Sequence, residues 1–226
     1  MSQTVEMHII ARIRSDFPTK FGIPRQSGLA DVPARIVFEP EYRNADALRG
    51  IEGFSHLWLI WQFSAAVREG WSPTVRPPKL GGNKRIGVFA TRSPFRPNEI
   101  GLSSVRLDRV EPNTPDGPVL HISGADLMDG TPIFDIKPYL AYTDSHPEAR
   151  GGFALTTDAV RVKCPAQLLE KLPQERRQTL LNVLAQDPRP GYQHEPGRVY
   201  GFPFAGFEVK FTVEGDLLTV RQIESR

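Results

Sequence analysis

The sequence predicts a mainly β protein: a closed or partly closed β-barrel followed by a small α+β unit at the C-terminal end. Two observations lead to this fold class. Up to about residue 142, short apolar runs are separated by clusters of Gly, Pro, Asn and Asp, with no helical pattern between them. Beyond that point, leucines recur at helical spacing and two further strand patterns follow. Many short strands at irregular spacing are typical of barrels rather than of sheets with alternating helices.

The strands expected in the barrel are the apolar runs of strand length. They span Met7–Ile13, Ala34–Phe38, His56–Phe63, Ile86–Ala90, Val105–Val110, Val119–Ile122 and Ile133–Ile136. One of them, His56–Phe63 (HLWLIWQF), is almost continuously apolar, as expected of a strand that is covered on both faces or packed at an interface. A helical turn is expected at Ala45–Arg49.

The C-terminal part begins with a polar linker, TDSHPEARGG, at residues 143–152. In Pro165–Gln186 the leucines fall at helical spacing, and Pro173 is expected to split the segment into two helices because proline breaks a helix interior. Phe207–Val213 and Leu217–Ile223 are expected to pair around a turn that contains Gly215. We therefore predict a β-barrel domain at residues 1–142 and a small α+β domain at residues 143–226.

The composition is that of a globular protein. Hydrophobic residues make up 39% of the chain, the formal net charge is +2, and no apolar run approaches the ~20 residues of a membrane-spanning helix. The first residues, MSQTVEMHII, lack a basic segment followed by a long apolar core, so no signal peptide is expected. The single cysteine, Cys164, excludes an intrachain disulfide and is expected to be structural. We therefore expect a soluble, cytoplasmic protein.

The most unusual part of the chain is Gly81–Leu102, with the sequence GGNKRIGVFATRSPFRPNEIGL. Between Arg76 and Arg96 the chain has six Lys or Arg residues and no Asp or Glu. Such a local excess of positive charge favours a partner that carries negative charge, and phosphate is the first candidate. A solvated basic loop is the alternative. The glycines and prolines in the segment favour a built site, because they constrain the path of the backbone.

Several familiar site patterns are absent from the sequence. It contains no GxGxxG fingerprint, so a nucleotide-derived cofactor would not be held in the Rossmann manner, and it contains no GxxxxGK[ST] phosphate loop. The five histidines form no close pair suited to a metal. We therefore expect neither a Rossmann fold nor a metal site based on histidine.

Two further segments concentrate polar residues that could bind a ligand. In FGIPRQSGL, Arg25 and Gln26 lie in a loop bracketed by glycines and can donate hydrogen bonds to a carboxylate or a base edge. In GADLMDGTPIFDIKPY, the aspartates Asp126, Asp129 and Asp135 could bind a hard cation, accept hydrogen bonds from ribose hydroxyls or shape turns.

Together these segments resemble the TsaA-like (VirR-like) family of tRNA methyltransferases, which modify N6-threonylcarbamoyladenosine. The resemblance rests on GIPRQSGL, RPPKLGGNKRIGVFATRSPFRPNEIGLS and DLMDGTPIFDIKPY, and it extends to ADALRGIEGFSHLWLIWQF and AQDPRPGY. One departure is Glu99, where relatives usually carry proline. The resemblance implies a β-barrel methyltransferase outside the Rossmann class that acts as a homodimer with S-adenosylmethionine. The implied methyl acceptor is N6 of threonylcarbamoyladenosine immediately 3′ of the anticodon, in the anticodon loop of tRNAs that read threonine codons.

The family pattern also implies which residues line the cofactor site. These are Pro24, Arg25, Gln26, Phe63, Ser64, Arg92, Leu102, Asp126, Leu127, Met128 and Asp129. For a tRNA partner, we expect phosphate contacts from Lys79, Lys84, Arg85 and Arg96, and further RNA contacts from Arg189 and Tyr192.

Methyl transfer to N6 would benefit from a group that accepts the N6 proton, because the lone pair of this nitrogen is delocalised into the purine and the adjoining carbonyl. Asp135 and Tyr139 are the candidates, since both lie at the polar end of a strand beside the implied cofactor loop. By strand alternation, Asp135 shares a face with Lys137, which suggests a site or an ion pair.

Two other functions remain open from the sequence. A noncatalytic RNA-binding module could use the same barrel, basic segment and exposed aromatic residues, and it would bind tRNA without a specific cofactor pocket. A magnesium-dependent phosphohydrolase could use Asp126, Asp129 and Asp135 as ligands, although all three come from one short segment.

Overall fold

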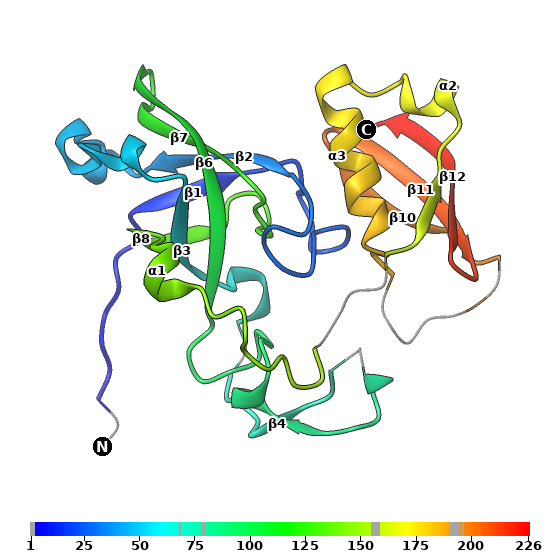
Figure 1. The fold of residues 1–226 in the computed structure, drawn as a ribbon, viewed down its shortest axis with the longest axis horizontal. Coiled ribbons are helices and arrows are strands. Elements are labelled where there is room, and N and C mark those ends of the chain that lie inside the picture. Colours follow the sequence, from blue (N-terminus) through cyan, green and yellow to red (C-terminus); the bar gives the residue numbers. More distant parts are fainter. Residues whose placement is uncertain (1–2, 68, 78–79, 155–158, 190–194, 196) are drawn as a thin grey trace.

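A closed six-stranded barrel forms the first part of the protein, and a second, four-stranded sheet lies beside it (Figure 1). The computed structural model describes residues 3–67, 69–77, 80–154, 159–189, 195 and 197–226. The strands follow one another around the barrel in the order β1-β2-β7-β6-β3-β8. The predicted fold class, a mainly β protein with a barrel core, is therefore confirmed.

The secondary structure elements have the following bounds. The barrel strands are β1 (Ala11–Arg14), β2 (Pro33–Phe38), β3 (His56–Gln62), β6 (Ile100–Thr114), β7 (Gly117–Ser123) and β8 (Pro132–Pro138). A separate hairpin consists of β4 (Thr74–Val75) and β5 (Ile86–Gly87). The remaining strands are β9 (Arg161–Lys163), β10 (Tyr200–Phe204), β11 (Phe207–Glu214) and β12 (Leu217–Ser225). The α-helices are α1 (Ala141–Asp144), α2 (Ala166–Leu169) and α3 (Gln174–Ala185). Short 3₁₀ helices lie at Pro40–Tyr42, Ala45–Leu48, Ile51–Gly53, Ser64–Ala66 and Val88–Ala90.

The barrel is filled by side chains that alternate along its strands. In β3, the side chains of Leu57, Leu59 and Trp61 are buried in the barrel core, while the residues between them are only partly covered. This pattern corrects the expectation that HLWLIWQF is covered on both faces. Two of its outward residues, Trp58 and Ile60, are apolar, and the exposed Leu102 of the neighbouring strand β6 lies directly opposite Ile60.

The long strand β6 closes the barrel because its two halves pair with different neighbours. The half from Ile100 to Arg106 pairs with β3, and the half from Arg106 to Thr114 pairs with β7, with two register irregularities in the second half. Such irregularities let a strand bend and turn a flat sheet into a barrel. All six strands bring a set of loops to the barrel end where β3 and β7 finish and β2, β6 and β8 begin.

Three predicted strands have different lengths in the structure. The first expected strand, Met7–Ile13, begins only at Ala11. The run Ile86–Ala90 is a strand only at its first two residues and then turns into a 3₁₀ helix, because it pairs with the equally short β4. Conversely, Val105–Val110 is the middle of a strand of 15 residues.

The second sheet has the order β10-β11-β12-β9, with α3 lying across it (Figure 1). The predicted hairpin β11–β12 and the helix break at Pro173 are confirmed. Strands β9 and β10 were not predicted. Strand β10 contains a glycine and Pro203, which weaken a strand pattern; it lies at the edge of the sheet, where a residue without an N–H is tolerated.

The core of the second sheet also includes residues from the segment between β1 and β2. Phe17, Ala30 and Val32 are buried there, and the ring centroid of Phe17 lies 5.4 Å from that of Phe204. The segment between β1 and β2 therefore shares a hydrophobic core with the C-terminal sheet. The domain boundary near residue 142 stays a prediction.

Candidate active site at one end of the barrel

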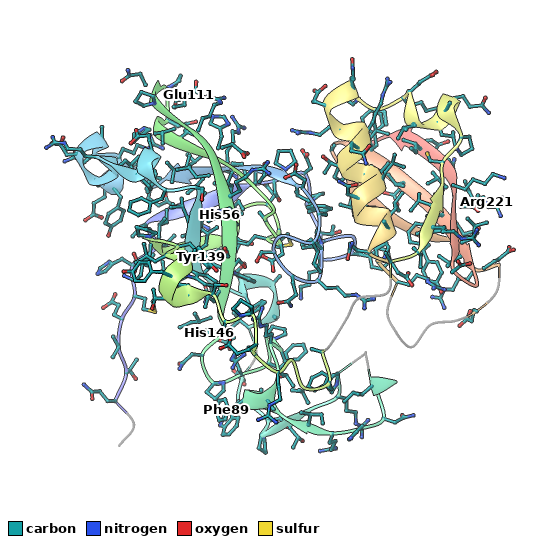
Figure 2. The ribbon with its side chains drawn as sticks, viewed as in Figure 1. His56, Phe89, Glu111, Tyr139, His146 and Arg221 are labelled. Atoms are coloured by element: carbon teal, nitrogen blue, oxygen red, sulfur yellow. The ribbon has the colours of Figure 1, made fainter. Side chains whose placement is uncertain are left out.

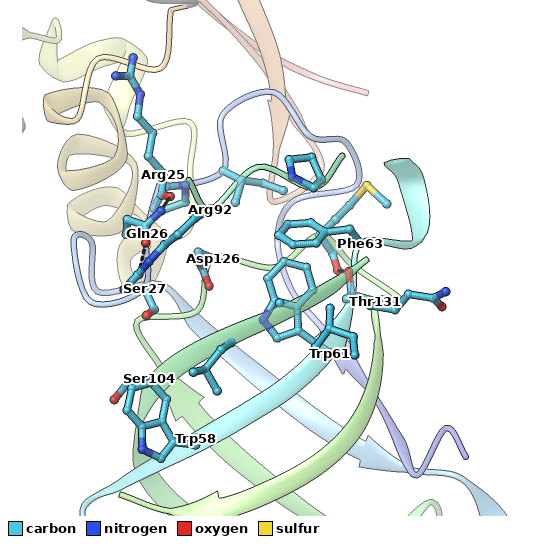
Figure 3. Close-up of a pocket in the computed structure, with 18 of the residues that line it drawn as sticks. Arg25, Gln26, Ser27, Trp58, Trp61, Phe63, Arg92, Ser104, Asp126 and Thr131 are labelled. Atoms are coloured by element: carbon cyan, nitrogen blue, oxygen red, sulfur yellow. Dashed lines mark hydrogen bonds between the residues drawn. The ribbon is translucent and has the colours of Figure 1, made fainter. Parts of the chain in front are cut away.

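A cavity of about 1700 Å³ opens at the end of the barrel where the loops gather and extends along the outer face of β3 and β6. Its lining includes residues 23–28, the end of β3 with residues 63–66, Arg92 with residues 94–98, the start of β6, and Ser123, Gly124, Asp126 and Met128. The three segments that the sequence analysis singled out thus meet in one place. Figure 3 shows a close-up of this cavity.

A chain of hydrogen bonds holds the carboxyl group of Asp126, whose place in the cavity lining is labelled in Figure 3. Ser103 Oγ donates to Asp126 Oδ1 over 2.6 Å, and Trp61 Nε1 donates to Ser103 Oγ over 2.9 Å. The indole of Trp61 can reach Ser103 because it lies against Gly101, where a Cβ atom would come within 2.3 Å of the ring. Ser103 of β6 therefore holds Asp126 directly, and Trp61, packed against Gly101, holds Ser103.

The pKa of Asp126 is raised above that of an ordinary aspartate, and burial is the largest cause. Hydrogen bonds from Ser103 and from backbone N–H groups, together with the charge of Arg92, oppose this shift. A desolvated carboxyl group that faces a cavity is suited to a ligand that carries positive charge, because such a ligand replaces the lost solvation of the carboxylate.

Two arginines, Arg25 and Arg92, also line the cavity. Arg92 donates a hydrogen bond to the side-chain oxygen of Gln26. Arg25 Nη2 donates to the backbone carbonyl oxygens of Asp187 and Arg189, over 3.1 and 2.9 Å. Because these acceptors are uncharged, the arginines keep their capacity to pair with an anionic group of a ligand.

Aromatic rings supply the flat surfaces of the cavity. Trp61 and Phe63 lie with their ring centroids 4.3 Å apart, and Figure 3 shows both rings beside the carboxyl group of Asp126. Further along the outer face, the ring centroids of Trp58 and Tyr139 are 5.4 Å apart, and Trp58 Nε1 donates to Asp144 Oδ2 over 2.7 Å. Hydrogen bonds from the Leu140 N–H and from Trp58 lower the pKa of Asp144, so this carboxyl group stays ionised.

The cavity brings together most of the residues that the family pattern implies for the cofactor. They are Pro24, Arg25, Gln26, Phe63, Ser64, Arg92, Leu102, Asp126 and Met128. Two do not line it. Leu127 is buried in the barrel core, and Asp129 accepts a hydrogen bond from the Ser15 N–H and lies 3.9 Å from Arg14. The cofactor role of the set stays a prediction.

The two candidates for the proton acceptor are separated by the structure. Tyr139 lines the cavity, whereas Asp135 does not. Asp135 Oδ2 lies 2.9 Å from Lys137 Nζ in an ion pair whose side chains are both more than 40% exposed. Strand alternation suggested either a site or an ion pair at Asp135, and the structure has the ion pair with Lys137.

The predicted RNA contacts lie in different surroundings. Lys84 and Arg85 are exposed on the hairpin β4–β5, and Arg96 lines the cavity. Arg189 is 9% exposed and forms two hydrogen bonds of 2.8 Å with the carboxylate of Asp187, so its guanidinium is not presented to an RNA backbone. Lys79 and Tyr192 lie outside the described residues.

The three aspartates proposed as magnesium ligands take separate partners: Ser103, Ser15 and Lys137. Across the part of the chain that the structure describes, no group of three or more His, Cys, Asp or Glu residues could hold a metal ion. The described residues therefore offer no cluster of metal ligands that would support the phosphohydrolase hypothesis.

Sequence reasoning missed the residues that support the site from neighbouring strands. Trp58, Trp61, Ser103 and Asp144 were not proposed, although all but Ser103 line the cavity. The alternation of HLWLIWQF could have separated the inward Trp61 from the outward Trp58. The bond between Ser103 and Asp126 depends on tertiary pairing, which no local pattern indicates.

Comparison with known proteins assigns the chain to a family. Residues 12–145 match the model of the tRNA-methyltransferase O N-terminal domain, and residues 157–226 match the TrmO C-terminal domain. The chain belongs to the TrmO family. No helix in the described ranges is long and apolar enough to cross a membrane.

Individual TrmO relatives agree with this assignment along almost the whole chain. A tRNA (adenine(37)-N6)-methyltransferase of Escherichia coli K12 is 42% identical over 96% of this chain and 97% of its own length. A Pseudomonas aeruginosa protein, provisionally named S-adenosylmethionine-dependent methyltransferase RcsF, is 44% identical over 85% of each chain. A crystal structure of TrmO from P. aeruginosa superposes with a TM-score of 0.79 at 36% identity, covering 100% of this chain and 99% of that one.

Proposed function

We propose that the protein transfers a methyl group from S-adenosylmethionine to N6 of adenosine 37 of tRNA. The observation that carries this proposal is the cavity at the barrel end, in which a partly buried, desolvated carboxyl group, aromatic rings and arginines converge. Membership of the TrmO family supports the reaction, because the E. coli relative is named for methyl transfer to N6 of adenine 37 in tRNA. The name of the P. aeruginosa relative supports the cofactor.

The donor groups of the cavity fit S-adenosylmethionine. This cofactor has a flat adenine, a carboxylate, and positive charges on its sulfonium and ammonium groups. The rings of Trp61 and Phe63 offer apolar faces for the adenine, and the desolvated carboxyl group of Asp126 suits a positive charge. Arg25 and Arg92, whose hydrogen bonds within the described residues go to uncharged oxygens, suit the carboxylate. When bound, the cofactor supplies an electrophilic methyl group.

The contribution of the chain itself is mainly positional. Much of the acceleration of a methyl transfer comes from holding the two reacting atoms close together and in line, and the cavity walls are built from barrel strands that hold their side chains in place. Between our two candidates for the group that accepts the N6 proton, the geometry supports Tyr139, whose ring packs on Trp58 inside the cavity.

Replacing Tyr139 with phenylalanine tests this assignment. The variant keeps the aromatic ring beside Trp58 and loses only the hydroxyl oxygen, so we expect kcat to fall about 100-fold while the KM for the cofactor is unchanged. Asp135→Asn is the matched comparison, and we expect it to keep the native kcat. If Asp135→Asn lost turnover and Tyr139→Phe did not, the proton acceptor would be Asp135, as the sequence alone also allowed.

The finer features of the proposal come from the family resemblance. The acceptor adenosine would carry a threonylcarbamoyl group, in tRNAs that read threonine codons, and the enzyme would work as a cytoplasmic homodimer. The outer face of β3 and β6 supports a dimer, because Ile100 and Leu102, which line the cavity there, are 37% and 57% exposed. Light scattering of the purified protein would measure its mass in solution and so test the dimer.

The substrate can be tested by incubating the protein with methyl-labelled S-adenosylmethionine and two preparations of one threonine tRNA. One preparation carries threonylcarbamoyladenosine and the other is unmodified. Chromatography of the nucleosides should show label in the threonylcarbamoylated adenosine alone. Equal labelling of both preparations would remove the threonylcarbamoyl requirement. Binding of tRNA without any transfer would favour the noncatalytic RNA-binding module.

The hairpin residue Lys84 should contribute one phosphate contact to tRNA binding. Because each neutralised phosphate releases counterions, Lys84→Ala should reduce the slope of log K against log salt concentration by about one unit. Fluorescence anisotropy of labelled tRNA over a range of salt concentrations measures this slope. Lys163→Ala, an exposed lysine in the second sheet, is the control, and an equal reduction in both variants would show that the charge of Lys84 has no specific role.

A further inference from the structure

Two aromatic rings are held out to solvent at the base of the hairpin β4–β5. The hairpin pairs Thr74 with Gly87 and Val75 with Ile86, and the Val88 N–H donates to the Pro73 carbonyl over 2.9 Å. The 3₁₀ helix that starts at Val88 buries this valine and turns the next residue, Phe89, outward. Figure 2 shows Phe89 in the lower part of the molecule, away from the barrel core.

Trp71 lies beside Phe89 on the other arm of the hairpin. The two ring centroids are 6.1 Å apart, and the ring planes are inclined by 31°. Phe89 is 74% exposed and Trp71 is 53% exposed. An exposed pair of large rings on a protein surface marks a site of interaction, because leaving so much apolar area in water is unfavourable.

The electrostatic surroundings of this pair are entirely basic. From Gly70 to Asn98 the chain has no Asp or Glu, and Arg76, Lys84 and Arg85 are exposed on the hairpin. Arg85 Nη1 donates to the hydroxyl oxygen of Thr74 over 3.3 Å. Throughout the described residues, no ion pair includes any of these three cations. The partner must therefore offer negative charge as well as apolar surface.

Single-stranded nucleic acid offers this combination. Its bases present flat apolar faces and its phosphates present charge, and proteins that bind it combine aromatic side chains with basic ones. Phe89 also lines the large cavity, together with Arg92 and Arg96. A base that stacks on Phe89 would therefore belong to a nucleotide close to the one that enters the cavity.

We infer that Trp71 and Phe89 form a stacking surface for an unpaired base of the anticodon loop next to the methylated adenosine, while Arg76, Lys84 and Arg85 hold the adjoining phosphates. The inference rests on the proposed function for its RNA. It adds a binding surface, formed by the hairpin β4–β5, that positions the anticodon loop over the cavity.

The test measures binding of a fluorescently labelled anticodon stem-loop by anisotropy at one fixed salt concentration. Trp71→Ala and Phe89→Ala should each weaken binding about tenfold or more, because one stacked base contributes that much to affinity. Phe89→Tyr keeps the ring and should bind as the native protein does. Phe89→Leu keeps an apolar side chain without an aromatic face and should resemble Phe89→Ala. Tyr142→Ala removes a ring that is 87% exposed on α1, outside the cavity lining, and should change nothing.

Three results would overturn the inference. Native affinity in both alanine variants would show that no base stacks on these rings. Full binding by Phe89→Leu would show a general apolar contact instead of stacking. A change of molecular mass in light scattering of the alanine variants would make this face a contact between protein chains. Because the assay requires no methyl transfer, it gives its answer even if the native protein proves not to methylate the RNA.

Discussion

Replacing Asp126 with asparagine should weaken the binding of S-adenosylmethionine about 100-fold and, at the same time, raise the melting temperature of the free protein. The loss of affinity follows because removing one partner of a buried charge pair costs several kcal/mol. The gain in stability follows because burial raises the pKa of Asp126, which means that its ionised form is unfavourable in the free protein at neutral pH. Asparagine keeps an oxygen that can accept the hydrogen bond from Ser103 without the charge.

The same group should make cofactor binding depend on pH. A carboxyl group whose pKa is raised takes up a proton at a higher pH than the ordinary value of about 4, so affinity should begin to fall above that value as the solution is acidified. The stability of the free protein should change in the opposite direction. The folded state binds the proton more readily than the unfolded state, so this group's contribution to stability is lost as the pH rises through its folded pKa.

Calorimetric titration with S-adenosylmethionine and thermal unfolding of the free protein measure both effects. Asp135→Asn is the matched control for the binding measurement, because Asp135 lies outside the cavity lining in an exposed ion pair. An Asp126→Asn variant that binds the cofactor with native affinity would show that this carboxyl group does not hold a positive charge of the ligand.

Replacing Gly101 with alanine should displace Trp61 and so disturb the hydrogen bonds that hold Asp126. The added Cβ would lie 2.3 Å from Trp61 Cε2, so the indole would have to leave its place against β6 and would lose its hydrogen bond to Ser103. We expect the protein to lose about 1–3 kcal/mol of stability, as for other overpacked positions, and the cofactor affinity to fall with it. Gly53→Ala is the control, since no heavy atom lies within 4 Å of its added Cβ.

Denaturant unfolding and calorimetry of these two glycine variants distinguish a local from a general effect. A Gly101→Ala protein that unfolds earlier but binds the cofactor normally would show that Trp61 supports the barrel without supporting Asp126. Native stability together with native affinity would mean that the contact between Gly101 and Trp61 is not as close as the structure has it.

The barrel could be predicted from the sequence because its strands carry local signals. Apolar runs bounded by glycine and proline correspond to β2, β3, β7 and β8 within a few residues. Strand β10 could not be predicted, because its glycine and Pro203 look unfavourable until the sheet order shows that the strand lies at an edge. Phe17 gave no sign that it belongs to the core of the second sheet, since that contact joins distant parts of the chain.

The candidate site, too, could be predicted from the sequence only in part. Arg25, Gln26 and Asp126 could be proposed because each lies in a segment of unusual composition, and the fold brings these segments to one cavity. The hydrogen-bond chain at Asp126 could not be predicted, because it joins Ser103 from one strand and Trp61 from another. Arg189 was assigned to RNA from its charge alone, and only the structure shows that Asp187 already occupies its guanidinium.

The most direct test of the account is to locate the transferred methyl group within the tRNA. The native protein is incubated with labelled S-adenosylmethionine and either a threonine tRNA isolated with its modifications or the same tRNA with guanosine at position 37, and the digested fragments are analysed by mass spectrometry. We predict one methyl group, on the base of adenosine 37, and none in the guanosine variant. Label at another nucleotide, or no label from a folded protein that binds the tRNA, would contradict the proposed function.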